Sequence, residues 1–175
     1  LRPSPQAMGL APDGLAGGES STAPPRPSVS SHDALRSGYF YTVSPAYFFL
    51  LGSQVGGIAH LYRLALTRDG AETAALALAV MAVTSTIGRL IGGALLIKVP
   101  ARAFALVMMA MQGLGLFLLA GAEGRIAIAG GVAVFGLTMG NSLMLHPLLL
   151  VDRFGAREIG RIYSVSQVLT MSGLA

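Results

Sequence analysis

The sequence predicts an all-α protein, a polytopic bundle of transmembrane helices, on three observations. Apolar residues fill 53% of the 175 positions and charged residues only 11%, whereas charged residues make up about a quarter of a soluble domain. The apolar residues gather in segments as long as a helix that crosses a bilayer, without the period-two alternation of membrane strands. Short loops such as "KVPAR" and "EGR" join these segments, so successive helices must run antiparallel.

The N-terminal region, residues 1–43, is expected to be a cytoplasmic linker without fixed structure. Its first 38 residues hold six of the nine prolines, many glycines and serines, and no continuous apolar core or secretory signal peptide. The chain starts with Leu1 rather than methionine and stops at Ala175 inside an apolar stretch. We therefore expect a fragment of a longer protein.

Residues 44–175 are expected to form the transmembrane region. A helix needs about 20 residues to cross roughly 30 Å of hydrocarbon, and four apolar runs reach that length while a fifth is cut short. The first run ends before the polar stretch 68–72, and the second ends at Lys98. The third lies between "KVPAR" and "EGR", and the fourth ends before Asp152. The predicted spans cover about 44–67, 73–97, 103–122 and 126–151, with a truncated one from 161.

The distribution of basic residues predicts which loops are cytoplasmic. The linker and the loops 98–102 and 152–161 carry an excess of arginine and lysine, whereas Arg63, Arg68 and Arg125 on the other side are offset by acids. The linker and both basic loops are therefore expected in the cytoplasm. Eleven arginines against one lysine are typical of a GC-rich bacterial genome, so the plasma membrane of a bacterium, its inner membrane, is the expected location.

Glycines four residues apart recur in three of the four complete spans and predict close helix packing. The cluster Gly88, Gly92 and Gly93 is the strongest candidate for such a packing role. Glycine is also common in membrane helices, so pairs at this spacing arise by chance in a chain with 23 of them.

Two loops that lie 55 residues apart end alike, since Lys98 and Arg102 match Arg153 and Arg157 in spacing. A basic pair repeated after alternate helices resembles the major facilitator superfamily of secondary transporters. The stretch "GRLIGGALLIKVPAR" resembles the pattern G-R-x-x-G-G-x-L-x-D-R-x-x-x-R that follows the eighth helix of that family, and "DRFGAREIGRIY" resembles its turn between helices ten and eleven.

This resemblance covers essentially the whole chain and implies the central linker, helices seven to ten and part of eleven. It assigns gating and packing roles to the matching positions, which are Gly88, Gly92, Gly93, Lys98, Arg102, Asp152 and Arg153. The acid that precedes the basic residue in the family is Ile97 here, so the implied latch is weakened at this loop.

Arg89 stands about 13 Å inside the cytoplasmic end of its predicted helix and shares a face with Ser85 and Gly92. A charge at this depth has to face other helices or water rather than lipid. Two roles remain open. Arg89 can donate to backbone carbonyls near a gate, or it can bind an anionic solute, as the resemblance to monocarboxylate and oxalate:formate carriers implies. Asn141 and His60 are further candidates for the solute cavity, with His146 behind them.

Other functional classes are disfavoured. An enzyme is not expected, because the spans contain no aspartate or glutamate and three scattered histidines form no catalytic or metal set. The chain has no cysteine and so no thiolate metal site, and no cofactor is expected. Nucleic acid is not an expected partner, because the basic residues do not gather on one polar face.

The predicted function is a secondary active transporter of a small solute, an organic anion being the candidate, working by alternating access. Its partners are the lipid bilayer, the solute and the missing N-terminal half of six helices. The alternatives are a membrane scaffold or receptor with the same bundle, or a transporter that exports a hydrophobic compound.

Overall fold

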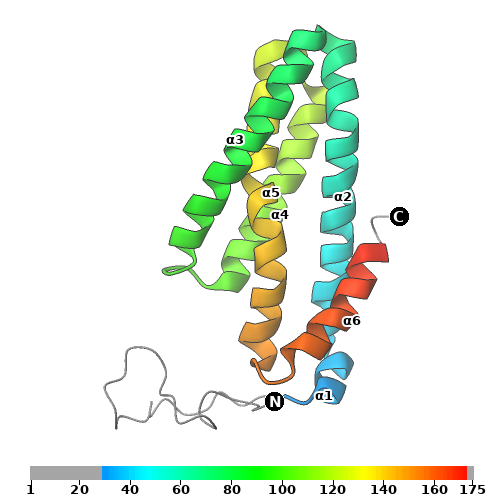
Figure 1. Ribbon diagram of the computed structural model, residues 1–175, viewed down its shortest axis with the longest axis vertical. Helices are drawn as coiled ribbons and strands as arrows, with labels where there is room; N and C mark the ends of the chain where they lie inside the picture. The colour runs from blue at the N-terminus through cyan, green and yellow to red at the C-terminus, as the bar shows by residue number, and fades with distance from the viewer. Residues whose placement is uncertain (1–28, 173–175) are drawn as a thin grey trace, which may run out of the picture.

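The computed structural model describes residues 29–172, which form six helices and contain no strand (Figure 1). The fold class expected from the sequence, an all-α bundle, is confirmed for these residues. The helices are α1 (Ser31–Arg36), α2 (Gly38–Asp69), α3 (Ala71–Leu95), α4 (Ala101–Gly121), α5 (Gly124–Phe154) and α6 (Ile159–Met171).

The long helices α2 to α5 run alternately up and down, as the short loops required, and α5 lies at the centre (Figure 1). Helix α5 packs along α3 on one side and α4 on the other, while α6 packs against the lower part of α2. Since α3 and α5 are separated by one upward helix, they run parallel. This places the C-terminal half of α3 against the middle of α5, around residues 136–141.

The helix boundaries follow from local chemistry. Ser37 accepts a hydrogen bond from the Phe40 N–H and so starts α2 at Gly38. Gly70, with φ of 91°, ends α2 and starts α3, and Gly155, with φ of 81°, ends α5. The linker expected over 1–43 is corrected at its end, because residues 31–36 and 38–43 are helical. Its residues 1–28 lie outside the described part of the chain.

Three of the described helices, α3, α4 and α5, are long and apolar enough to cross a bilayer, which indicates a membrane-embedded protein. The sequence predicted four complete spans; three of them coincide with these helices, and the fourth, over 44–67, falls within α2 and stays a prediction. Helix α2 has 32 residues and sufficient length. Its composition is more polar, because Gln54, His60 and Arg63 interrupt the apolar run.

Polar contacts hold the ends of the bundle. At one end, the Arg68 guanidinium of α2 donates to the carbonyls of Leu119, Ala120 and Ala122 at distances of 2.7 to 3.0 Å. These carbonyls belong to the last turn of α4, where backbone acceptors lack helical partners. At the other end, the Ser31 N–H donates to the Glu158 carboxylate at 2.7 Å and holds the pKa of that carboxyl below its usual range.

Candidate functional site

Arg89 lies on α3, six residues before the helix ends at Leu95, which is about 9 Å along the axis. The residue is exposed at the surface of the bundle. Its aliphatic stem passes over Gly140 of α5, where an added Cβ would come within 2.7 Å of the Arg89 Cγ. The sequence placed Arg89 inside a helix interface. The structure places only its stem there, and no hydrogen bond or ion pair joins Arg89 to another residue within 29–172.

The contact between α3 and α5 is formed by four glycines, Gly88, Gly92, Gly136 and Gly140, which we call the glycine seam. A Cβ on Gly88 would collide with the backbone carbonyl of Leu137, and one on Gly140 would collide with that of Ser85. Because the seam has no side chains, the two backbones approach within contact distance. Gly93, expected in the same packed cluster, has open space instead where a side chain would be.

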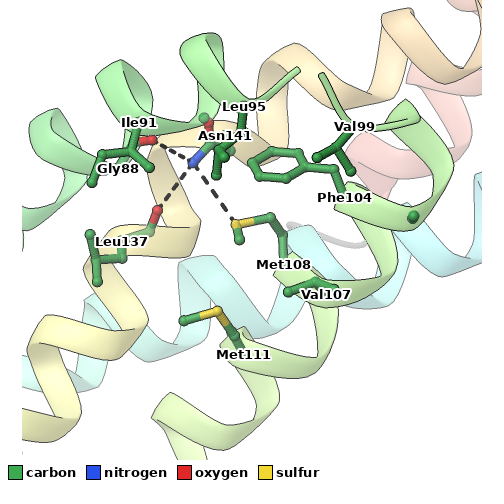
Figure 2. Close-up of a pocket in the computed structure, with 12 residues that line it drawn as sticks. Gly88, Ile91, Leu95, Val99, Phe104, Val107, Met108, Met111, Leu137 and Asn141 are labelled. Carbon is green, nitrogen blue, oxygen red and sulfur yellow. Dashed lines mark hydrogen bonds between the residues drawn. The ribbon is translucent and has the colours of Figure 1, made fainter. Parts of the chain in front are cut away.

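Asn141 of α5 joins the two helices at the seam (Figure 2). Its side-chain amide nitrogen donates to the Gly88 carbonyl at 2.9 Å and to the Leu137 carbonyl at 3.2 Å. Its Oδ1 is buried, has no hydrogen-bond partner among the described residues, and lies against Gly92. The sequence favoured Asn141 as a residue of the solute cavity. In this arrangement its donor is already used between helices.

Beside Asn141, a cavity of about 440 Å³ opens between α3, α4 and α5 (Figure 2). Its wall is apolar except for Asn141, and it includes exposed side chains of both outer helices, such as Ile91 of α3 and Val107 of α4. We call it the α3–α4 cavity. It is lined by Gly88, Ile91, Gly92, Leu95, Val99, Ala103, Phe104, Val107, Met108, Met111, Leu137 and Asn141.

His60 and Arg89 lie at different depths in the bundle. His60 is exposed on α2, nine residues before the helix end at Asp69, whereas Arg89 comes eighteen residues after α3 begins at Ala71. Because α2 and α3 form a hairpin, these two positions differ in depth by about 14 Å. The two residues could contact the same small solute only if it spanned that distance.

Lys98, Arg102, Asp152 and Arg153 lie near the turns that follow α3 and α5, all at the same end of the bundle, and all four are exposed. Within residues 29–172 the ion pairs are His32 with Asp33 and Arg125 with Glu72, so none of these four residues takes part in one. The basic side chains at this end are therefore available to bind anions from outside the described residues.

A buried polar cluster lies between α2, α5 and α6, and of its members the sequence analysis named only His146, ranked below Asn141 and His60. His146 Nε2 lies 2.8 Å from the Ser166 Oγ, which lies 2.7 Å from the Ser44 Oγ, and the Tyr47 ring stacks on the imidazole with centroids 4.3 Å apart. Each residue is isolated in its own apolar segment. No local pattern could have joined them, because their proximity depends on how α2 and α6 dock on α5.

The site thus combines an exposed cation, a glycine seam and an apolar cavity. Residues 29–172 contain no group of three or more histidines, aspartates and glutamates that could hold a metal ion. No known protein family, curated protein or solved structure matches this chain.

Proposed function

We propose that this chain forms most of the second half of a secondary transporter of the major facilitator type, which moves a small solute by alternating access. The observation that carries the proposal is Arg89, an exposed arginine on a helix apolar enough to span the membrane. A charge within the bilayer costs at least about 2.5 kcal/mol when it faces lipid. Arg89 would therefore face a second protein half or an aqueous path.

The direction of the Arg89 side chain supports this environment. In a helix each Cα–Cβ bond tilts toward the N-terminus, so Arg89 leans away from the nearer end of α3 at Leu95. Extending to that membrane surface would require the side chain to reverse its direction. A short route to water is more readily provided by a cavity at mid-membrane.

The exposed surface of α3 has two different strips. Apart from Leu78, the strip that contains Arg89 is made of small or polar residues spaced three or four apart: Ala75, Ala79, Ala82, Thr86 and Gly93. The other strip consists of branched aliphatic residues: Leu76, Val83, Ile87 and Leu90. Small residues favour close approach of another protein, whereas aliphatic ones suit lipid. The Arg89 strip would therefore face the missing half and the solute path.

The composition of α2 agrees with a place beside this path. Its exposed residues include Ser53, His60 and Arg63 within an otherwise apolar helix. Polar groups inside a membrane protein usually face the bundle interior or a water-filled cavity. The lower hydropathy of α2 would then reflect a cavity wall, with the bilayer touching only its other face.

The end of the bundle that carries the turns after α3 and α5 would face the cytoplasm. That end bears Lys98, Arg102, Arg153, Arg157 and Arg161. At the opposite end, the three arginines are matched by Asp69, Glu72 and Glu123. Excess positive charge marks the cytoplasmic side in the plasma membrane.

Arg89 would bind a carboxylate of the solute, because a guanidinium presents two parallel N–H donors that match two carboxylate oxygens. Lysine retains the charge but not the paired donors, and glutamine loses the charge. The test is uptake of small radiolabelled carboxylates by the full-length protein in proteoliposomes. We expect Arg89→Gln to weaken apparent affinity by at least about tenfold, since charged hydrogen bonds contribute about 1.5–3 kcal/mol, and Arg89→Lys to lie between.

Arg125→Gln is the matched control, because Arg125 is exposed at a helix end and pairs with Glu72 at 2.8 Å in a surface salt bridge of little energetic weight. If both Arg89 variants retain wild-type affinity and turnover, Arg89 does not bind the solute. If the wild-type protein shows no solute-dependent uptake at all, a scaffold or receptor replaces the transporter.

A further inference from the structure

The α3–α4 cavity is separate from the strip that carries Arg89, and its position suggests a different ligand. Exposed residues on both sides of the opening, Ile91 and Leu95 on α3 and Val107 on α4, bring its wall to the surface of two helices that can span the membrane. These residues are large and aliphatic, unlike the small residues through which membrane helices associate. The opening therefore suits lipid better than another helix.

The interior of the cavity suits a hydrocarbon chain. Asn141 is the only residue in the lining with a polar side chain, and its amide nitrogen already donates to two backbone carbonyls. The volume of about 440 Å³ falls in the range of about 300–1,000 Å³ that holds small ligands. A polar solute would find only the buried Asn141 Oδ1 as a further partner there, whereas an acyl chain needs none.

One end of the cavity is positively charged. Val99 lines it and directly follows the exposed Lys98, whereas Arg102 lines a separate pocket of α4 against α2. Lys98 forms no ion pair within the described part of the chain, and the residue before it, Ile97, is apolar and brings no acid to this turn. The turn therefore presents one unpaired cation, Lys98, next to an apolar cavity.

The start of α4 adds to this charge. Pro100 is the N-cap residue and gives no side-chain cap, so the first backbone N–H groups of α4 remain free for a ligand. The 21-residue helix also directs the positive end of its dipole toward this turn. A phosphate at this turn would thus meet Lys98 and free N–H groups together.

We propose that the α3–α4 cavity binds an anionic phospholipid, with one acyl chain in the cavity and its phosphate at the turn formed by residues 96–100. This lipid site does not depend on whether the protein transports a solute. Its occupant would fill the space between α3 and α4 and so support the splayed end of α3 against α5.

The test is native mass spectrometry of the full-length protein in neutral detergent, with phosphatidylglycerol and phosphatidylcholine of identical acyl chains. We expect phosphatidylglycerol to be retained preferentially. Lys98→Gln should weaken its binding about fivefold, the factor given by about 1 kcal/mol per basic residue near a membrane surface. Arg157→Gln, at the same end in another turn, is the control and should keep wild-type binding.

The cavity itself is tested by Ala103→Phe, which fills it, against Leu114→Phe on an exposed part of α4 outside its lining. Only Ala103→Phe should lower lipid retention. A photoreactive acyl chain should crosslink to the cavity lining, within residues 88–111 or at residues 137–141, in the wild-type protein.

Equal retention of both lipids, or crosslinks confined to other helices, would overturn the proposal. Loss of the lipid upon addition of millimolar inorganic phosphate would also overturn it, because the turn would then be a simple anion site without a role for the acyl chain. Thermal unfolding of each variant in detergent checks that it is folded. The crosslinking experiment uses the wild-type protein, so its result does not depend on the folding of any variant.

Discussion

At the scale of single residues, Asn141 is the side chain whose environment is most sharply defined. Its amide nitrogen faces two carbonyls, those of Gly88 and Leu137, at 2.9 and 3.2 Å. A donor in that position stabilises the contact of α3 with α5, and interhelical hydrogen bonds in membranes contribute about 0.6 kcal/mol on average and up to about 1.7. Asn141 is therefore a structural residue of the seam.

We expect Asn141→Asp to destabilise the protein more than Asn141→Ala does, although aspartate has nearly the same shape. Alanine removes the two hydrogen bonds and should cost about 1–2 kcal/mol. Aspartate places a carboxylate oxygen against two carbonyl oxygens, which adds repulsion and the cost of a buried charge, a further few kcal/mol. Thermal unfolding in detergent shows which of the two variants is less stable.

Ser142→Ala is the control for this pair, because the Ser142 hydroxyl donates only within its own helix, to the Thr138 carbonyl at 3.2 Å. It should be nearly neutral. Equal stability of the Asp and Ala variants would show that the amide does not donate to both carbonyls and would return Asn141 to the solute cavity.

The position of Arg89 could be predicted from the sequence better than the role of Asn141, for a physical reason. The depth of Arg89 follows from its distance to the helix end, and because α3 ends at Leu95 the predicted depth of about 13 Å becomes about 9 Å. Which edge of its helical face is covered depends on the neighbouring helix, so the sequence overestimated its burial. The role of Asn141 depends on the register of α3 against α5, which no local pattern encodes.

At the scale of helices, the glycine seam determines how closely α3 and α5 approach. We expect Gly88→Ala to destabilise the protein by about 1–3 kcal/mol, since the new methyl group meets the rigid Leu137 backbone and forces the helices apart. Gly93→Ala, five residues later on the same helix, meets open space and should be neutral or slightly stabilising because alanine favours a helix.

Chemical or thermal denaturation of both variants in one detergent tests this contrast. The two substitutions are chemically identical and differ only in what surrounds the added methyl group. Similar stability of the two variants would mean that α3 and α5 do not pack through Gly88, and the placement of Arg89 over Gly140 would fall with it.

The same scale explains which helices the sequence predicts well. Polar loops and glycines bound the runs of α3, α4 and α5, and their predicted ends lie within three residues of those found. Helix α2 begins at Gly38, earlier than predicted, because its start depends on the Ser37 cap rather than on apolar composition. A prediction from apolar content alone misses the first residues of α2, because they precede the hydrophobic run.

At the scale of the whole molecule, the distribution of charge predicts the orientation in the membrane. The turn after α5 lies at the end with excess arginine and should face the cytoplasm, whereas the turn before α5 should face outward. Ala156 and Glu123 are exposed residues of these two turns. A cysteine at either position would report its side, since this chain has no cysteine of its own.

We expect a membrane-impermeant maleimide to label Glu123→Cys in intact cells and to label Ala156→Cys only after the membrane is permeabilised. Ile97→Cys, in the turn after α3, is the control for topology. The hairpin of α4 and α5 separates it from Ala156, so both residues must lie on the same side of the membrane. The reverse labelling pattern would invert the orientation and leave the bundle intact. Labelling of Ile97→Cys and Ala156→Cys from opposite sides would instead contradict the up-and-down arrangement of α4 and α5, on which the placement of Arg89 and the α3–α4 cavity depends.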